Sequence, residues 1–160
     1  MEQRVKKFAS AAPPVRAHRL LIISCSAAKR HGPPAEMPAI ERYDGVFFKV
    51  LRKALREGHC RVPVEVRIIS AKYGLVNPET RIPSYNVRMD TRQAEKLRSS
   101  IRRKLQRTIN KNKPREILVN LGKAYAEIIR DLPELENATW AAGPIGKRAG
   151  ALKSWLVNDK

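Results

Sequence analysis

Short apolar runs alternate along this chain with segments whose apolar residues recur at helical spacing. Runs of the first kind predict buried β-strands, and the β-branched residues among them favour strands covered on both faces. Segments of the second kind predict amphipathic helices with one apolar face. The predicted strands span residues 20–23, 62–69, 116–120 and 138–141, and the predicted helices span residues 41–57, 90–111 and 123–130, with a last one opening at 143–148 and running through Leu156.

This alternation of strands and helices predicts an α/β fold: a single three-layer α/β/α domain with a mostly parallel central sheet. We assign residues 18–160 to that domain and residues 1–17 to a basic, partly disordered N-terminal arm. The carboxyl ends of parallel strands meet at one edge of the sheet, where such folds bind their ligands. Four segments are therefore expected to converge there: 25–29, 70–86, 120–123 and 143–148.

The segment between Ser70 and Asn86 follows a predicted buried strand and has no apolar period of its own. Long irregular segments within a compact domain are uncommon and often functional. Its apolar and aromatic side chains argue against disorder, so we predict an ordered loop over a site. Gly74 is a position at which this loop can take a positive φ.

A strong excess of positive charge indicates what kind of partner the protein binds. The chain carries 33 Lys and Arg against 15 Asp and Glu, a formal net charge of +18. Such an excess predicts a polyanionic partner, and we expect nucleic acid, with DNA favoured and tRNA as the alternative. No apolar run is long enough to span a membrane, so no membrane association is predicted. The sequence gives no indication of oligomeric state.

Much of this charge falls on the helix predicted over residues 90–111, where like charges repel one another along the helix. A bound polyanion would relieve that repulsion, although a solvated face is the alternative interpretation. The turn after residue 143 precedes a basic helix start, a common place for phosphate. The residues expected to bind phosphate are Lys29, Ser70, Arg102, Arg103, Arg107, Lys123, Lys147 and Arg148.

Cysteine and histidine usage bounds the remaining chemistry. Two cysteines, Cys25 and Cys60, are too few for a disulfide framework and fit a reduced, cytoplasmic protein. The three histidines lack metal-ligand spacing with either cysteine, so we predict no metal. No nucleotide-cofactor motif is present, and we expect no cofactor.

Several of these segments resemble a superfamily that joins the peroxide-stress YaaA proteins and the core domain of archaeosine synthase. The resemblance covers roughly residues 20–100. Its motifs are Cys25-Ser26-x-x-Lys29, Tyr43 with Phe47 or Phe48, Ser70-Ala71-Lys72-Tyr73-Gly74-Leu75-Val76 with Pro78-Glu79, and Pro83-Ser84-Tyr85-Asn86. Archaeosine synthase modifies a base in tRNA, YaaA proteins bind DNA, and the shared core is similar to the uracil-DNA glycosylase fold. The resemblance therefore implies that fold and a nucleic-acid partner.

We predict from these features an enzyme that acts on a base of nucleic acid, most simply a DNA N-glycosylase that flips and excises a modified base, as found in phage DNA. A tRNA base-modifying enzyme and a non-catalytic DNA-binding stress protein are the alternatives. Asp44, Lys72 and Asn86 are the candidate catalytic residues: a carboxylate, an amine and an amide that orients water. The candidate base-binding residues are Cys25, Ser26, Tyr73, Tyr85 and Asn120, the last because residues 117–120 resemble the base-reading strand of glycosylases.

Overall fold

A mixed, mostly parallel five-stranded sheet organises the chain in the computed structural model, which describes residues 18–158. The strands are β1 (Arg19–Ser24), β3 (Val64–Ser70), β4 (Gly74–Val76), β6 (Glu116–Asn120) and β7 (Thr139–Trp140). Their order is β4-β3-β1-β6-β7, and only β4 runs antiparallel to its neighbour. The predicted α/β class and the mostly parallel sheet are confirmed.

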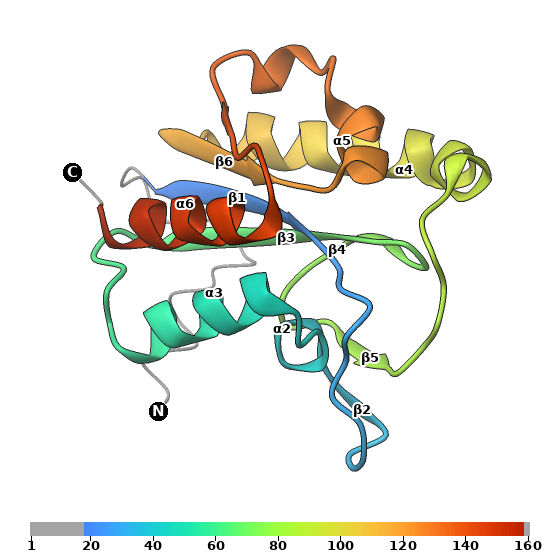
Figure 1. Cartoon of the computed structure of the whole chain (residues 1–160). Coiled ribbons are helices and arrows are strands. Elements are labelled where there is room, and N and C mark those ends of the chain that lie inside the picture. The colour runs from blue at the N-terminus through green and yellow to red at the C-terminus, as the bar shows by residue number, and fades with distance from the viewer. Residues whose placement is uncertain (1–17, 159–160) are drawn as a thin grey trace.

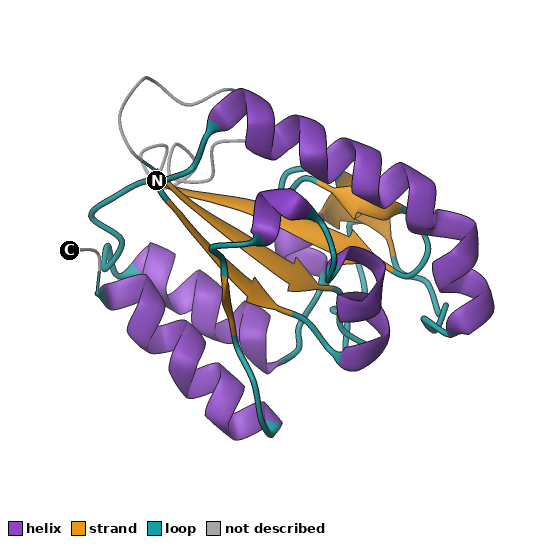
Figure 2. Ribbon diagram, turned by 90° about the horizontal axis from the view of Figure 1, so that it is seen from above, coloured by secondary structure: helices purple, strands orange, loops and turns teal. Residues whose placement is uncertain are grey.

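Helices cover both faces of this sheet (Figure 1). One layer contains α3 (Val46–Arg56) and α6 (Ile145–Val157), and the other contains α4 (Thr91–Asn112) and α5 (Lys123–Ile129). Figure 2 shows the strands fanning out between these layers. Of the described helices, none is long and apolar enough to cross a membrane.

Strand β1 shows how the sequence builds two cores at once. Successive side chains of a strand point to opposite faces. Leu21 and Ile23 accordingly pack into the core under α3 and α6, while Leu20 and Ile22 pack into the core under α4 and α5. All four side chains are fully buried, as the wholly apolar run predicted.

Helix α4 begins and packs where the sequence indicates. The Asp90 carboxylate accepts a hydrogen bond from the backbone N–H of Gln93 at 2.8 Å, an N-cap that satisfies one of the free donors of the first turn. Ile101, Leu105 and Ile109 are its buried residues. Its basic residues lie on the remaining faces.

The helix predicted over residues 41–57 is in fact two helices, α2 (Ala39–Arg42) and α3, separated by residues 43–45. Tyr43 leaves the helical path because its ring is fully buried and its backbone forms a bridge with Lys29. The guanidinium of Arg52 donates to the carbonyls of Ile40 and Tyr43, both at 2.7 Å, and so holds the break.

The prediction of an irregular loop from Ser70 to Asn86 was wrong in its local structure. Gly74 opens β4 with a φ of 76°, as its residue type suggested, and β4 turns back along β3. Farther on, β5 (Arg81–Pro83) pairs with β2 (Glu36–Pro38) to form a second, two-stranded sheet. Strands of three residues are too short to show an alternating pattern, so the sequence could not reveal them.

This small sheet is fixed beside the ends of the main strands by one buried cation. Arg42 is 1 % exposed, and its guanidinium donates to the carbonyls of Arg30, Pro34, Ala35 and Ile82. Four backbone acceptors satisfy this guanidinium without a carboxylate. The loop after β1 and the segment before Tyr85 are thereby held together.

The domain prediction can be compared with the structure only in part. Residues 18–158 contain the two-layered core around the sheet described above. The predicted arm, residues 1–17, and the last residues of the predicted domain, 159–160, lie outside the described part of the chain.

Candidate functional site

The crevice between β1 and β6 is the topological switch point of the sheet. These neighbouring parallel strands send the chain to opposite faces: after β1 it leads to α3, and after β6 it leads to α5. Ligands of open α/β sheets bind in such crevices, because the two loops separate there. The carboxyl ends of β1, β3, β6 and β7 all lie at this edge of the sheet.

A pocket of about 180 Å³ lies at this crevice, and we call it the switch-point pocket. Three segments form it: the loop after β1, the segment that leads into α4, and the first turn of α5. Its lining residues are Cys25, Ser26, Ala27, Lys29, Asn86, Val87, Arg88, Met89 and Tyr125. Two of them are cationic, and none carries a carboxylate.

Cys25 and Tyr125 connect the loop after β1 to the first turn of α5, and Cys25 also contacts the turn after β3. The Cys25 sulfur lies 3.2 Å from the Tyr125 hydroxyl and accepts a hydrogen bond from the backbone N–H of Ala71 at 3.4 Å. Burial raises the pKa of Tyr125, with the neighbouring Cys25 as a further cause, so this hydroxyl stays protonated. Tyr125 therefore presents a neutral hydroxyl beside the thiol.

Lys29 is the cation closest to the aromatic groups of the site. Its ammonium donates to the carbonyl of Ser26 at 3.0 Å and lies 4.4 Å from the centroid of the Tyr85 ring. Partial burial lowers the pKa of Lys29 below its usual 10.5, while Cys25 acts in the opposite direction. The ring face favours the charged form, so Lys29 is an ammonium that gives up its proton more readily than a solvated lysine.

Behind Lys29 lies a set of three hydroxyls that we call the tyrosine network: Tyr43, Ser70 and Tyr85. The Tyr85 hydroxyl lies 2.6 Å from that of Tyr43 and 2.9 Å from that of Ser70. The Ser70 oxygen also accepts from the backbone N–H groups of Lys72 and Tyr73. Burial raises the pKa of Tyr43 to about 12 and raises that of Tyr85 as well, so the network is neutral at physiological pH.

The structure divides the three predicted catalytic residues. Asn86 lines the switch-point pocket. Lys72 is exposed, with its ammonium 5.3 Å from the Tyr73 ring and 5.6 Å from the Tyr85 ring. The carboxylate of Asp44 is bound by Arg52, with Arg30 at 4.0 Å, and it does not line the pocket. The candidate carboxylate is therefore used in an ion pair that holds the break between α2 and α3.

Three of the five predicted base-binding residues lie at or next to the pocket. Cys25 and Ser26 line it, and the Tyr85 ring lies 4.4 Å from the ammonium of Lys29, which also lines it. The Tyr73 ring meets that of Tyr85 edge to face at 5.5 Å. Asn120 is fully buried at the end of β6, where its side-chain oxygen accepts from Arg148 at 3.0 Å and its amide nitrogen has no partner among the described residues.

The predicted phosphate-binding residues fall into different environments. Ser70 is fully buried within the tyrosine network, so it cannot contact a phosphate in this structure. Arg102 donates to Asp131 at 2.6 Å and faces α5, and Arg148 is half-buried against Asn120 and the Phe47 ring. Lys123 and Lys147 are exposed at the starts of α5 and α6, and Arg103 and Arg107 are exposed on α4.

Two residues that line the pocket, Arg88 and Tyr125, were not predicted from the sequence. Arg88 is exposed, lines the pocket and has no ion pair within residues 18–158. Tyr125 is the third residue of α5, the helix that begins directly after β6. Its position one turn beyond a strand end was the available signal, because the first turn of such a helix faces the crevice. Within the described residues, no group of three His, Cys, Asp or Glu side chains is placed to hold a metal ion.

A comparison with known protein families gives a match. The sequence profile of a family of unknown function, DUF6884, matches residues 20–158, which include every strand and helix from β1 to α6 except the first residue of β1, Arg19. The search of curated proteins finds no match.

Proposed function

Because the chain belongs to a family of unknown function, DUF6884, we propose its function from the site itself: it binds nucleic acid and acts on a single extruded base, most simply as a DNA N-glycosylase. The observation that carries this proposal is the switch-point pocket with its carboxylate-free, cationic lining. The net charge of +18 supports a polyanionic substrate. The resemblance of residues 20–100 to base-acting and DNA-binding proteins of uracil-DNA-glycosylase-like fold supports the same class.

The size of the pocket favours one base over a larger ligand. Pockets that hold drug-sized molecules and cofactors measure about 300–1,000 Å³. At about 180 Å³ the switch-point pocket is smaller and suits a planar ring system more than a whole nucleotide cofactor. The Asn86 amide and the Tyr125 hydroxyl offer both donors and acceptors to the edge of such a ring. A base reaches this pocket only when it has left the helical stack.

The charges of the lining favour stabilisation of the departing base. Cleavage breaks the C1′–N bond, its electron pair goes to the base, and the sugar becomes cationic. With no carboxylate in the lining, the pocket does not stabilise the sugar cation, so the phosphates of the substrate serve that role. The ammonium of Lys29 stabilises the negative charge on the base, which then takes a proton from solvent. Water then adds to C1′ and loses a proton to solvent.

The decisive experiment incubates the purified protein with single-stranded and duplex DNA that is normal, uracil-containing or hypermodified. Free base measured by mass spectrometry, together with strand breaks after alkali, is the expected result for one of the modified substrates. If tRNA instead gains or loses mass while no DNA releases base, the protein modifies tRNA. If it binds DNA and changes neither substrate, it is a binding protein without this catalysis.

A further inference from the structure

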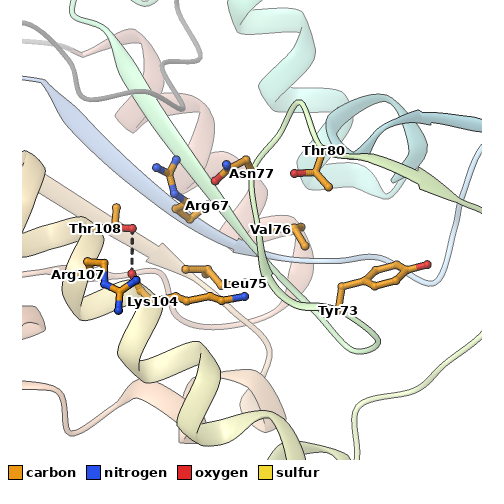
Figure 3. Close-up of a pocket in the computed structure, with 9 residues that line it drawn as sticks. All are labelled: Arg67, Tyr73, Leu75, Val76, Asn77, Thr80, Lys104, Arg107 and Thr108. Atoms are coloured by element: carbon orange, nitrogen blue, oxygen red, sulfur yellow. Dashed lines mark hydrogen bonds between the residues drawn. The ribbon is translucent and has the colours of Figure 1, made fainter.

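A second cavity, larger than the switch-point pocket, lies on the other side of the tyrosine network. It measures about 490 Å³ and runs between α4 and the edge strand β4, so we call it the α4–β4 groove. Figure 3 shows its lining side chains, with Lys104 and Arg107 on α4 and the Tyr73 ring at the opposite end. The lining residues are Arg67, Tyr73, Leu75, Val76, Asn77, Thr80, Lys104, Arg107 and Thr108.

Two of the three cations in this groove are not neutralised. The Arg67 guanidinium binds the buried carboxylate of Glu65 at 2.7 Å, so its charge is balanced. Lys104 and Arg107 are exposed one helical turn apart, and neither has an ion-pair partner within residues 18–158. No Asp or Glu is among the described residues that line the groove. Two like charges at this spacing repel each other unless an anion lies between them.

The two faces of α4 differ in this respect. Arg102 binds both Asp131 and the carbonyl of Ile128, so that face of the helix is fixed to α5. The face with Lys104 and Arg107 points toward β4 (Figure 3). Lys104 and Arg107 therefore present positive charge without an ion-pair partner to the groove.

Two ring contacts link the α4–β4 groove to the switch-point pocket. Tyr73 lines the groove, its ring lies 5.5 Å from the Tyr85 ring, and the Tyr85 ring lies 4.4 Å from the Lys29 ammonium in the pocket. The Lys72 ammonium lies beside both rings. Cations thus lie in both cavities: Lys104 and Arg107 line the groove, and Lys29 and Arg88 line the pocket.

We propose that the α4–β4 groove binds the phosphodiester backbone of a nucleic-acid strand next to the base held in the switch-point pocket. This proposal rests on the proposed function, since it assigns the groove to the same substrate. Lys104 and Arg107 contact phosphate oxygens, and Asn77 and Thr80 donate to the backbone or to an adjacent base. A positively charged groove with an aromatic side chain at its end is the usual arrangement for binding single strands.

The test uses the full chain and a labelled single-stranded oligonucleotide, with affinity measured against salt concentration by fluorescence anisotropy. Each phosphate contact to a single strand contributes about 0.7 to the salt slope. The double variant Lys104→Gln/Arg107→Gln should therefore lower the slope by about 1.4, which corresponds to about 25-fold weaker binding at 0.1 M salt. Both side chains are exposed, so the fold is retained, as circular dichroism should show.

The matched control is Lys49→Gln/Lys53→Gln, which removes two exposed positive charges from α3 on the other face of the sheet. We expect this control to keep most of the wild-type slope. Equal losses in both double variants, or no loss in either, would overturn the groove assignment. Competition by polyglutamate that is as strong as competition by unlabelled DNA would also overturn it. So would a result in which inorganic phosphate binds only the wild type while the wild type and the double variant bind DNA with equal affinity.

The two proposals can fail separately. A protein that releases no base, yet binds DNA with a slope that depends on Lys104 and Arg107, keeps the groove and loses the glycosylase assignment. A protein that releases base, and whose groove variant binds and cleaves like the wild type, keeps the glycosylase and loses the groove.

Discussion

The tyrosine network and the switch-point pocket lie side by side at the same sheet edge, but their polar groups differ in how many partners they have. In the network, every hydroxyl is bonded to another hydroxyl, and Ser70 also accepts from two backbone donors. In the pocket, Asn86 and Arg88 have no side-chain partner among the described residues. A polar group whose bonds are complete within the protein stabilises the fold, while an uncommitted group is available to a ligand.

The largest expected effect falls on the pocket. Lys29→Met keeps much of the side-chain volume and removes the ammonium that lies 4.4 Å from the centroid of the Tyr85 ring and donates to the carbonyl of Ser26. Loss of one preorganised group that stabilises developing charge costs about 100- to 1,000-fold in rate. We expect base release to fall by that factor with the melting temperature nearly unchanged.

The exposed Lys49→Met on α3 serves as the control for Lys29→Met, and it should release base at the wild-type rate. Equal rates for wild type and Lys29→Met would remove Lys29 from the reaction. A large drop in melting temperature would instead place Lys29 with the tyrosine network as a structural residue.

Substitutions in the tyrosine network should have the opposite effect: they should lower the stability of the fold. Tyr85→Ala removes a half-buried ring that packs against the core and leaves the Tyr43 and Ser70 hydroxyls without their partner. The expected loss in free energy of unfolding is about 3 kcal/mol. Tyr85→Phe keeps the ring and should lose only about 1 to 2 kcal/mol, since it removes hydrogen bonds alone.

Urea denaturation of Tyr85→Ala and Tyr85→Phe measures both values. If Tyr85→Ala were as stable as the wild type, the network would not support the fold, and the contrast with the pocket would disappear.

Much of this contrast could not have been predicted from the sequence. The strands were predictable because wholly apolar runs such as residues 20–23 are buried on both faces, and α4 was predictable from its cap and its repeated apolar positions. Candidate residues could be placed at strand ends, because parallel strands align these ends. That argument brought Cys25 and Asn86 to one pocket.

The sequence could not show which side chains pair with one another in the folded protein. Asp44 looked like a free carboxylate, but Arg52, eight residues away, binds it because the chain breaks between α2 and α3. Arg102 and Arg107 look alike in sequence, but one meets Asp131 and the other faces a groove. The pairing of β2 with β5 has the same character, since each strand is stable only against the other. Such features depend on long-range contacts that no local pattern encodes.

A smaller effect on stability is expected from the tyrosine network at high pH. Burial raises the pKa of Tyr43 to about 12, whereas an unfolded tyrosine ionises near 10. The folded state therefore holds this proton where the unfolded state has lost it. The stability from this group is complete below pH 10 and is lost as pH rises toward 12.

Tyr43→Phe removes this contribution. Over this range, the wild type should lose about 2 kcal/mol more free energy of unfolding than the variant. Parallel curves of stability against pH, for wild type and variant, would show that Tyr43 is not held neutral by the fold.

The smallest effect at neutral pH comes from Lys29→Arg. Both side chains are charged at pH 7, so we expect rates of base release within a few-fold of each other. The ammonium is the active form in our proposal, and burial lowers its pKa below 10.5. As pH rises through that lowered value, the wild type should lose activity while Lys29→Arg keeps it, because a guanidinium remains charged.

Lys49→Arg should follow the wild-type profile, since Lys49 is exposed and does not line the pocket. A wild-type rate that rises with pH would contradict the proposal, because it would make the neutral amine the active form. Lys29 would then act as a nucleophile on the sugar, and borohydride reduction would trap it covalently on DNA. Lys29 would still do the chemistry, but through a bond to the substrate in place of a charge beside it.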